Sequence, residues 1–191
     1  TTGNYARIAM TDTELKGIND TTEIVITDKD ADTQSGQQDV IKVTVKSSSD
    51  TNGFDILLRE SSNQSGVFTS TAYSKWLGIS LSASDAANYK IKALNGDTIW
   101  ITYKDSQPLS YWTDTLTINL AKIAIKSPPN NVDTSVTPIT ITGTVTGVDI
   151  GDSIVVYRNG VAQNTGVVSN GLIFSISVTL SGIGDSISID V

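Results

Sequence analysis

Histidine and cysteine are both absent from this sequence of 191 residues. Without them the chain cannot form a Ser-His-Asp triad, a cysteine nucleophile or a zinc site with histidine or cysteine ligands. Glutamate is scarce as well and occurs only at Glu14, Glu23 and Glu60. A pair of aspartates can still run glycoside hydrolysis, but the sequence singles out no such pair. We therefore expect that the protein is not an enzyme.

Long apolar runs and an excess of basic residues are also missing. No stretch approaches the ~18 consecutive apolar residues of a membrane-spanning helix, so we expect no membrane span. The net charge of -7 and the pI of about 4.4 argue against nucleic acid and anionic membranes as partners, and favour divalent cations. The absence of cysteine does not imply a cytosolic location, because a secreted chain with adequate cores needs no disulfides.

Alternating runs of valine, isoleucine and threonine are abundant, and they are typical of β-strands with one buried face. Two of the clearest runs are VIKVTVK and FSISVTL. The side chains predicted to face a core are Ile41, Val43 and Val45 in the first run and Phe174, Ile176 and Val178 in the second. Helical periodicity is nearly absent, so the sequence predicts an all-β fold.

Asn-Gly pairs between these runs indicate tight turns, because both residues tolerate the positive φ angles of a hairpin. They occur at 52–53, 95–96, 159–160 and 170–171. A second kind of signal begins at Ser127, where SPPNNVDTSVTP holds three of the four prolines. Just before it, residues 116–125 alternate, and we interpret them as the last strand of one unit leading almost directly into the first strand of the next. We predict two domains, residues 1–122 and 123–191.

An acidic loop, TDKDADTQSGQQD, lies between two predicted strands. With Asp28 counted as position 1, carboxylates fall at positions 1, 3, 5 and 12, which are Asp28, Asp30, Asp32 and Asp39. Like charges held this close repel one another, so either solvent screens them or a cation lies among them. Calcium prefers oxygen ligands and accepts irregular geometry.

The loop is not the calcium loop of a helix-loop-helix motif. Thr33 stands where that motif requires glycine, Asp39 replaces the bidentate glutamate, and strands flank the loop. Two interpretations remain open. The four aspartates bind calcium, with Asp50, Asp55 or Asp105 completing the shell, or they form a solvated turn, a setting that suits aspartate.

The first predicted unit resembles an immunoglobulin-like repeat of large bacterial and archaeal surface proteins. The resemblance rests on EIVITDKDADTQSGQQDVIKVTVKSSSD, DILLRESSNQSGVFTST and GDTIWITYKD, and covers roughly residues 5–120. The matching residues are Asp28, Asp30, Asp32, Asp39, Asn63, Gly66, Val67, Phe68, Gly96, Asp97, Thr98, Tyr103 and Asp105.

The second predicted unit resembles a bacterial immunoglobulin-like module that serves as a spacer in surface proteins and in secreted carbohydrate-active enzymes. The matching residues are Ser127, Pro128, Thr142, Gly143, Val145, Asn159, Gly160, Phe174, Val178, Leu180 and Ile187. Together the two resemblances imply tandem immunoglobulin-like β-sandwiches at the cell surface or outside the cell. Because sandwiches host many roles, they imply a fold more firmly than a function.

Three further features suggest contacts with other molecules. Tyr111 and Trp112 are adjacent, and Trp100 is out of phase with its apolar neighbours, which leaves carbohydrate binding open. Asn19 and Asn63 fit the N-glycosylation pattern. Asp149, Asp152, Asp133, Asp185 and Asp190 lie near predicted turns and strand ends of the second unit, where they either close turns or bridge copies through cations.

The segment NYARIAM, residues 4–10, is either an ordinary first strand or a strand donated to an open edge of another copy. We therefore expect a structural subunit of an extracellular assembly, such as a surface layer, filament or tube, that self-associates through strand edges or donated strands. Calcium stiffens its loops or contacts in this interpretation. The alternatives are an adhesin stalk or a module of a larger secreted protein that binds carbohydrate or a receptor, and an accessory region of a secreted hydrolase.

Overall fold

The computed structural model describes residues 3–128, 138–181 and 184–191 of the chain. The chain divides into two compact units, Thr1–Asn119 and Leu120–Val191, where the sequence had placed the boundary after Lys122. Apart from two single-turn 3-10 helices, the described elements are all strands, which confirms the prediction of an all-β fold. Among these residues no helix has the length and apolar character needed to cross a bilayer.

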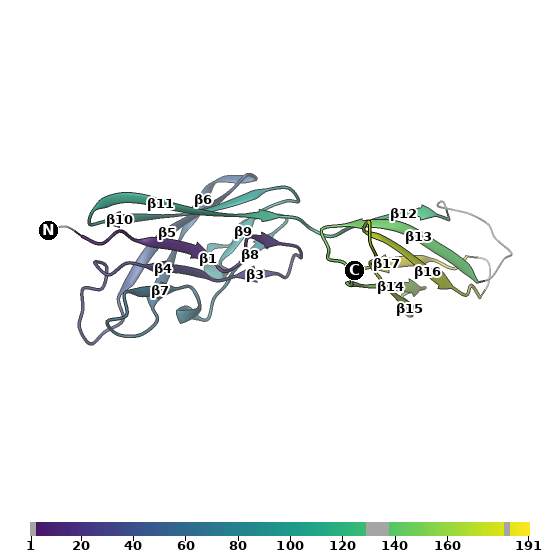
Figure 1. Ribbon diagram of the computed structural model, residues 1–191, viewed down its shortest axis with the longest axis horizontal. Coiled ribbons are helices and arrows are strands. Elements are labelled where there is room, and N and C mark those ends of the chain that lie inside the picture. Colours follow the sequence, from purple (N-terminus) through teal and green to yellow (C-terminus); the bar gives the residue numbers. More distant parts are fainter. Residues whose placement is uncertain (1–2, 129–137, 182–183) are drawn as a thin grey trace. The chain divides into compact units, whose positions relative to one another are not determined.

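The first unit is a curled sheet with a small second sheet beside it (Figure 1). The strands of the curled sheet follow the order β1-β4-β7-β6-β5-β10-β11-β2, and those of the small sheet the order β3-β8-β9. The strands are β1 (Arg7–Met10), β2 (Glu14–Leu15), β3 (Thr21–Thr22), β4 (Ile24–Thr27), β5 (Val40–Ser47), β6 (Asp50–Glu60), β7 (Val67–Thr69), β8 (Leu77–Ser80), β9 (Lys90–Lys92), β10 (Thr98–Ser106) and β11 (Leu109–Ile118). The helical turns are η1 (Thr71–Tyr73) and η2 (Ala86–Asn88).

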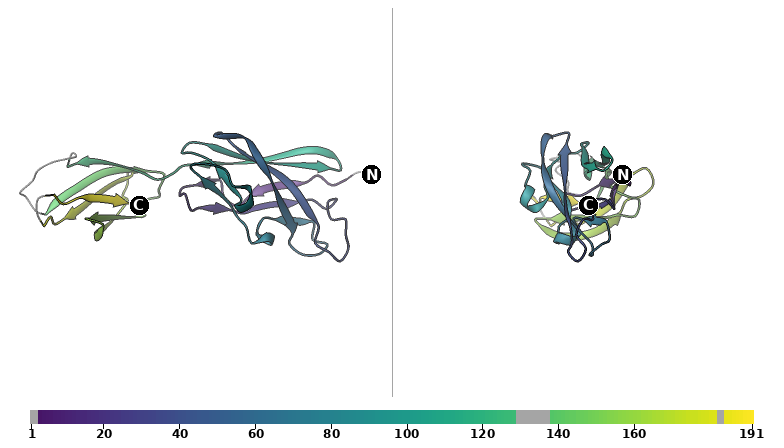
Figure 2. Two further views of the ribbon diagram at one scale, coloured as in Figure 1. Left: turned by 180° about the vertical axis from the view of Figure 1, so that it is seen from behind. Right: turned by 90° about the vertical axis from the view of Figure 1, so that its left-hand side faces the viewer.

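Period-two burial builds the core of this unit, because successive side chains of a strand point to opposite faces. Ile41, Val43 and Val45 on β5 are all buried, as predicted, and Lys42 and Lys46, whose side chains point to the other face, are exposed. The curl brings β4 and β7 to the opposite side of the core from β10 and β11 (Figures 1 and 2). Ile26 and Phe68 on those strands have no exposed surface.

The second unit has two three-stranded sheets, β12-β13-β16 and β15-β14-β17, in its described part. Their strands are β12 (Lys122–Ser127), β13 (Ile139–Thr146), β14 (Ser153–Arg158), β15 (Val161–Val167), β16 (Ile173–Val178) and β17 (Ile187–Asp190). Phe174, Ile176 and Val178 are buried, as predicted, and they share a core with Ile154 and Val156 of the other sheet.

The predicted Asn-Gly turns at 95–96, 159–160 and 170–171 are turns in the structure, and the one predicted at 52–53 is not. Asn159 and Gly160 both have positive φ, 50° and 79°, and connect β14 to β15 as a hairpin. Asn52 and Gly53, by contrast, lie inside β6. Gly53 has φ 60° there and lies so close to the opposite strand that an added Cβ would be 1.9 Å from the carbonyl oxygen of Val45. The glycine therefore allows the two strands to approach closely where the register of the β5–β6 ladder shifts, between Val45 and Ser47.

Two other expectations concern the chain path. The last strand of the first unit does lead almost directly into the first strand of the second, because β11 ends at Ile118 and β12 begins at Lys122. The N–H of Asn119 donates to the carbonyl of Leu15 at 2.9 Å, and so ends the strand against β2. The segment NYARIAM supplies β1, which pairs antiparallel with β4 in its own unit. In this structure it is an ordinary first strand.

Candidate functional site

The acidic loop divides its four aspartates between two environments. Asp28 is buried and acts as an internal cross-link, because its Oδ1 accepts hydrogen bonds from the N–H groups of Asp30 and Ala31 at 2.9 and 3.2 Å. Its Oδ2 accepts the phenolic O–H of Tyr103 at 2.7 Å. The Asp30 carboxylate accepts the N–H of Asn4 at 2.5 Å. Neither carboxylate belongs to the loop's group of converging acids.

Asp32 and Asp39 do converge, and the third member of the group is Glu60 at the end of β6. One carboxylate oxygen from each of these residues lies within 4.8 Å of the other two. We call these three residues the carboxylate cluster. The antiparallel pairing of β5 with β6 brings Glu60 to the loop, and the N–H of Asp39 donates to Glu60 Oε2 at 3.1 Å.

The three carboxylates of the cluster differ in their surroundings. Asp39 has a lowered pKa, chiefly because the N–H of Gln34 donates to it, at 2.9 Å, together with donors from Thr33. Burial acts to raise the pKa of Glu60, but hydrogen bonds from the N–H groups of Gly66 and Asp39 outweigh it, and the pKa is lowered. Both groups are therefore held in the charged form.

Asp32 faces these charges and is half-buried. Burial, followed by repulsion from Glu60 and Asp39, raises its pKa above the usual value. Two oxygens that share a calcium ion at 2.3–2.6 Å are at most about 5 Å apart, so the spacing within the cluster fits one such ion. Within the described part of the chain, the oxygens of the cluster with the fewest hydrogen bonds are those of the Asp32 carboxylate and Oε2 of Glu60, which accepts only the N–H of Asp39. These oxygens would be the first to coordinate the ion.

The other aspartates considered as calcium ligands lie elsewhere. Asp55 forms an ion pair with Lys42 at 2.7 Å. Asp50 accepts the hydroxyl of Ser84 at 2.5 Å. Asp105 is fully buried and accepts the N–H of Ala6 at 3.0 Å. Each of these carboxylates is thus a fixed hydrogen-bond acceptor away from the cluster.

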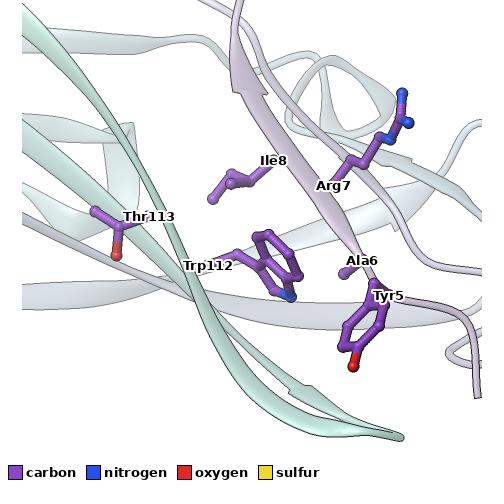
Figure 3. Close-up of a pocket in the computed structure, with 6 residues that line it drawn as sticks. All are labelled: Tyr5, Ala6, Arg7, Ile8, Trp112 and Thr113. Atoms are coloured by element: carbon purple, nitrogen blue, oxygen red, sulfur yellow. The ribbon is translucent and has the colours of Figure 1, made fainter.

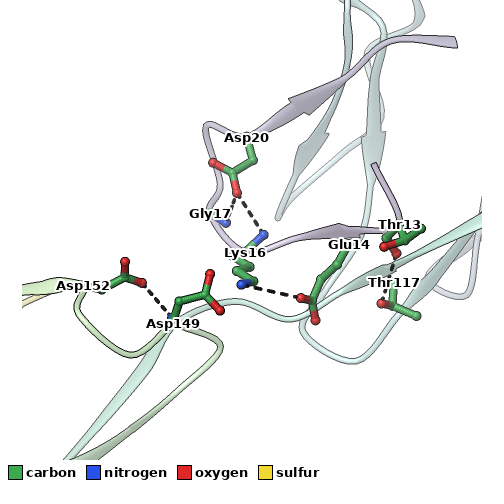
Figure 4. Close-up of polar contacts among 8 residues, drawn as sticks. All are labelled: Thr13, Glu14, Lys16, Gly17, Asp20, Thr117, Asp149 and Asp152. Atoms are coloured by element: carbon green, nitrogen blue, oxygen red, sulfur yellow. Dashed lines mark hydrogen bonds and ion pairs between the residues drawn. The ribbon is translucent and has the colours of Figure 1, made fainter. Parts of the chain in front are cut away.

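Acidic residues also close turns in both units (Figure 4). In the first unit Asp20 accepts the N–H groups of Lys16 and Gly17 at 2.9 and 2.7 Å. In the second unit the N–H of Asp149 donates to Asp152 at 2.8 Å. These contacts agree with the interpretation that Asp149 and Asp152 close a turn.

The remaining acidic residues of the second unit are Asp185, Asp190 and Asp133. Asp185 accepts the N–H of Ser181 at 2.7 Å and the side-chain amide of Asn159 at 2.8 Å, and these bonds lower its pKa. Asp190 is exposed at the end of β17. Asp133 lies outside the described residues. The glycosylation candidates Asn19 and Asn63 are both exposed.

A second candidate site is a cavity of about 520 Å³ at the edge of the first unit. It lies between the start of β1 and the middle of β11, and we call it the aromatic cavity (Figure 3). Its lining residues are Tyr5, Ala6, Arg7, Ile8, Trp112 and Thr113. The rings of Tyr5 and Trp112 meet edge to face, with centroids 6.0 Å apart. In Figure 3 the guanidinium of Arg7 points away from both rings.

The sequence pointed to only part of this cavity. It drew attention to Tyr111 and Trp112 as adjacent aromatics, whereas Tyr5 was not singled out. Tyr5 reaches Trp112 because β1 runs beside β11, a contact between residues far apart in the chain. Trp76 is 49% exposed and Trp100 36% exposed, so Trp100 faces outward as its phase indicates.

Comparisons with known proteins add little to this geometry. No protein-family model matches the chain, and no curated protein matches it either. Among solved structures, the chain is similar to the tetra-tandem repeat in the extending region of a large adhesion protein. The two share 15% identity with a TM-score of 0.32, and the match covers 92% of this chain and 41% of that one.

Proposed function

We propose that this protein is a non-enzymatic building block of an extracellular assembly, such as a surface layer, filament or tube, in which copies associate through strand edges. The observation that carries the proposal is the state of β12. In the described part of the chain β12 pairs with β13 on one side and with no strand on the other. Of its six residues only Ile123 is partly buried. An open edge of this kind is a ready template for another strand.

The charge of β12 supports association between copies. Lys122 and Lys126 give this edge a positive character, whereas the whole chain has a net charge of -7. An edge that is basic in an acidic protein attracts the acidic surface of another copy and repels its own counterpart. The resulting contact joins unlike surfaces, and a contact of that type that does not close into a ring extends into a filament.

The use made of the acidic residues supports a structural role over a catalytic one. Asp28, Asp39 and Asp105 accept several hydrogen bonds from backbone N–H groups and thereby tie loops to strands. A general acid or base must instead be free to exchange a proton with a substrate within hydrogen-bond reach. Carboxylates that are committed to the backbone serve as cross-links.

Calcium is part of the proposal. Asp32, Asp39 and Glu60 would hold the ion, which would offset two of the three converging negative charges and fix the acidic loop to the end of β6. Loops of this unit would then be stiffer and better able to form ordered contacts.

The experiment is negative-stain electron microscopy with sedimentation velocity on the purified protein, in calcium and then in chelator. We expect ordered polymers or large oligomers in calcium. The variant Lys122→Glu/Lys126→Glu should associate more weakly, and Lys90→Glu/Lys92→Glu on β9 is the matched control for the change in charge. Particles that remain dispersed under every condition would overturn the proposal.

A second candidate is an adhesin stalk or a module that binds carbohydrate or a receptor. The observation that favours it is the aromatic cavity, where Tyr5 is 69% exposed beside Trp112. Aromatic rings stack on sugar faces, so binding to a glycan array that is lost in Tyr5→Ala and kept in Trp76→Ala would support this candidate. A chain that polymerises and binds no glycan would support the first.

A further inference from the structure

The outer edge of β11 has backbone groups without a strand partner. Within the ladder to β10, the N–H of Ile118 donates to the carbonyl of Asp97 at 2.8 Å, so the even-numbered residues of β11 exchange hydrogen bonds with β10. The odd-numbered residues direct their N–H and C=O groups to the other side. β2 covers the end of that side, where the N–H of Thr117 donates to Thr13 at 3.0 Å. In the described structure, no strand pairs with the outward groups of Leu109, Tyr111 and Thr113.

β1 lies close to this edge without covering it by a backbone ladder. The N–H of Met10 donates to the side chain of Asp114 at 2.7 Å, and the N–H of Ala6 donates to the side chain of Asp105. Carboxylates therefore tie β1 to the β10–β11 hairpin at two points. Between those points lies the aromatic cavity (Figure 3).

β11 lacks the features that usually protect an edge strand. Natural edges often carry lysines, prolines or bulges, and lysines in particular repel the same edge of a second copy. The register of β11 with β10 is regular from Leu109 to Thr117, and the outward-facing side chains of this stretch are all uncharged. In contrast, β9 carries Lys90 and Lys92.

Exposed apolar side chains gather along the same edge. Tyr5 is 69% exposed, Leu109 69% and Tyr111 67%, and no other large hydrophobic side chain in the described residues is as exposed. Tyr5 belongs to the lining of the aromatic cavity, and Leu109 and Tyr111 lie on β11 itself. An apolar surface next to unpaired backbone groups is the surface that strand addition buries.

We infer that β11 pairs antiparallel with β11 of a second copy, about a two-fold axis at Tyr111. This inference rests on the proposed function, in which copies associate through strand edges, and it adds the β11 edge to that of β12. Because the unpaired groups belong to odd-numbered residues, Tyr111 faces Tyr111 of the second copy, and Leu109 faces Thr113. Each of these pairs exchanges two hydrogen bonds.

Chemistry favours a second copy as the occupant. Alternating N–H and C=O groups on an edge require another extended backbone, and a two-fold contact requires a surface that complements itself. The outward residues of β11 meet this condition, since placing the strand against itself opposes no like charges. For a chain with net charge -7, an uncharged edge is where two copies approach with the least repulsion.

The register makes a charge-exchange experiment decisive. In Tyr111→Lys two lysines would face each other across the axis, and in Tyr111→Glu two glutamates would do so; like charges directly opposite destabilise a strand pair. We expect each variant alone to weaken dimerisation by about tenfold or more. An equimolar mixture of the two should restore it, because lysine then faces glutamate. Sedimentation velocity across a concentration series measures all three samples.

A backbone test complements the charge exchange. Thr113→Pro removes an outward N–H and so costs no bond to β10, yet it blocks the edge. We expect it to weaken the dimer by about tenfold or more. Thr113→Val is the matched control, because it keeps the N–H and removes only the hydroxyl that contacts Thr102 at 3.0 Å. Circular dichroism verifies that each variant is folded.

The outcomes separate this inference from the proposed function. Association that is weakened by both charges and restored by mixing supports the β11 contact. Assemblies that form but ignore the changes at Tyr111 and Thr113 overturn the β11 contact and leave the proposed function standing. A chain that stays monomeric up to about 1 mM overturns both. An extended peptide that binds β11 of a chain that remains monomeric also overturns the second copy as occupant.

Discussion

Tyr103 and Asp28 are joined by a hydrogen bond of 2.7 Å between the phenolic O–H and the carboxylate Oδ2, although they are 75 residues apart in the chain. The bond is buried and links β10 to the start of the acidic loop. Burial, together with the Asp28 carboxylate, raises the pKa of the Tyr103 phenol. The phenol therefore stays protonated and keeps donating throughout the physiological range.

Tyr103→Phe should destabilise the first unit by about 1–3 kcal/mol, since it leaves a buried carboxylate oxygen without that donor. Urea unfolding followed by tryptophan fluorescence measures the change. Tyr111→Phe is the matched control, because Tyr111 is 67% exposed, and it should stay within about 0.5 kcal/mol of the parent. Equal losses in the two variants would contradict a structural role for the buried bond.

The buried faces of the strands were predictable from the sequence because burial alternates with period two. Val43 and Val45 on β5 and Phe174 and Val178 on β16 are buried as the alternation indicates. This signal is local, since it depends only on which face of one strand is apolar. It gives the fold class without giving the strand order.

The carboxylate cluster was only partly predictable because its third member comes from a distant strand. Asp32 and Asp39 were found from their spacing within one loop. Glu60 reaches them through the pairing of β5 with β6, and no spacing in the sequence encodes that pairing. Likewise, nothing local separates Asp28, which is buried on Tyr103, from the aspartates that remain in the loop.

Asp32→Asn should have opposite effects on stability in the two states of the cluster. Without calcium it should raise Tm, because it removes a carboxylate that faces Glu60 and Asp39 and has a raised pKa. With calcium it should abolish the rise in Tm that a ligand selective for the folded state produces. Differential scanning calorimetry in chelator and in calcium measures both effects.

Asp12→Asn controls for the loss of one negative charge in that calorimetric experiment. Asp12 is exposed and accepts the hydroxyl of Thr11 at 2.9 Å. We expect this variant to keep the full calcium-dependent rise in Tm. If the parent itself melts at one temperature with and without calcium, the cluster does not bind the ion.

Stability should fall with acid in a way that depends on Asp39. Its folded pKa is lowered from 3.8, so the unfolded chain binds more protons at low pH. The stabilisation is therefore fully present above the unfolded pKa and is lost as pH falls through the folded pKa. The pKa of Glu60 is likewise lowered, from 4.5, so Glu60 also loses its stabilising contribution in acid. The pKa of Asp32 is raised, so its protonation in acid favours the folded state and opposes the effect of the other two.

The test is the free energy of unfolding measured from about pH 6 to about pH 2. Asp39→Asn should be less stable than the parent at pH 6 and should show a shallower fall in acid. Asp12→Asn again serves as the control and should keep the slope of the parent. A slope in Asp39→Asn as steep as that of the parent would assign the acid sensitivity to other carboxylates.

Gly143 on β13 should not tolerate a side chain, although its φ is not of the left-handed kind. An added Cβ would lie 2.4 Å from the carbonyl oxygen of Ala124 and 2.6 Å from the ring of Phe174. Gly143→Ala should therefore destabilise the second unit by about 1–3 kcal/mol. Hydrogen exchange of the amides in β13 and β16 reports on this unit within the whole chain.

A double variant separates the two clashes at this position. Phe174→Leu removes the ring, but the carbonyl of Ala124 belongs to the backbone and cannot move out of the way. Adding Phe174→Leu to Gly143→Ala should consequently leave most of the destabilisation in place. Ser175→Ala on the exposed face of β16 should stay within about 0.5 kcal/mol of the parent. Full rescue by Phe174→Leu would mean that the ring, and not the close approach of β12, excludes a side chain at Gly143.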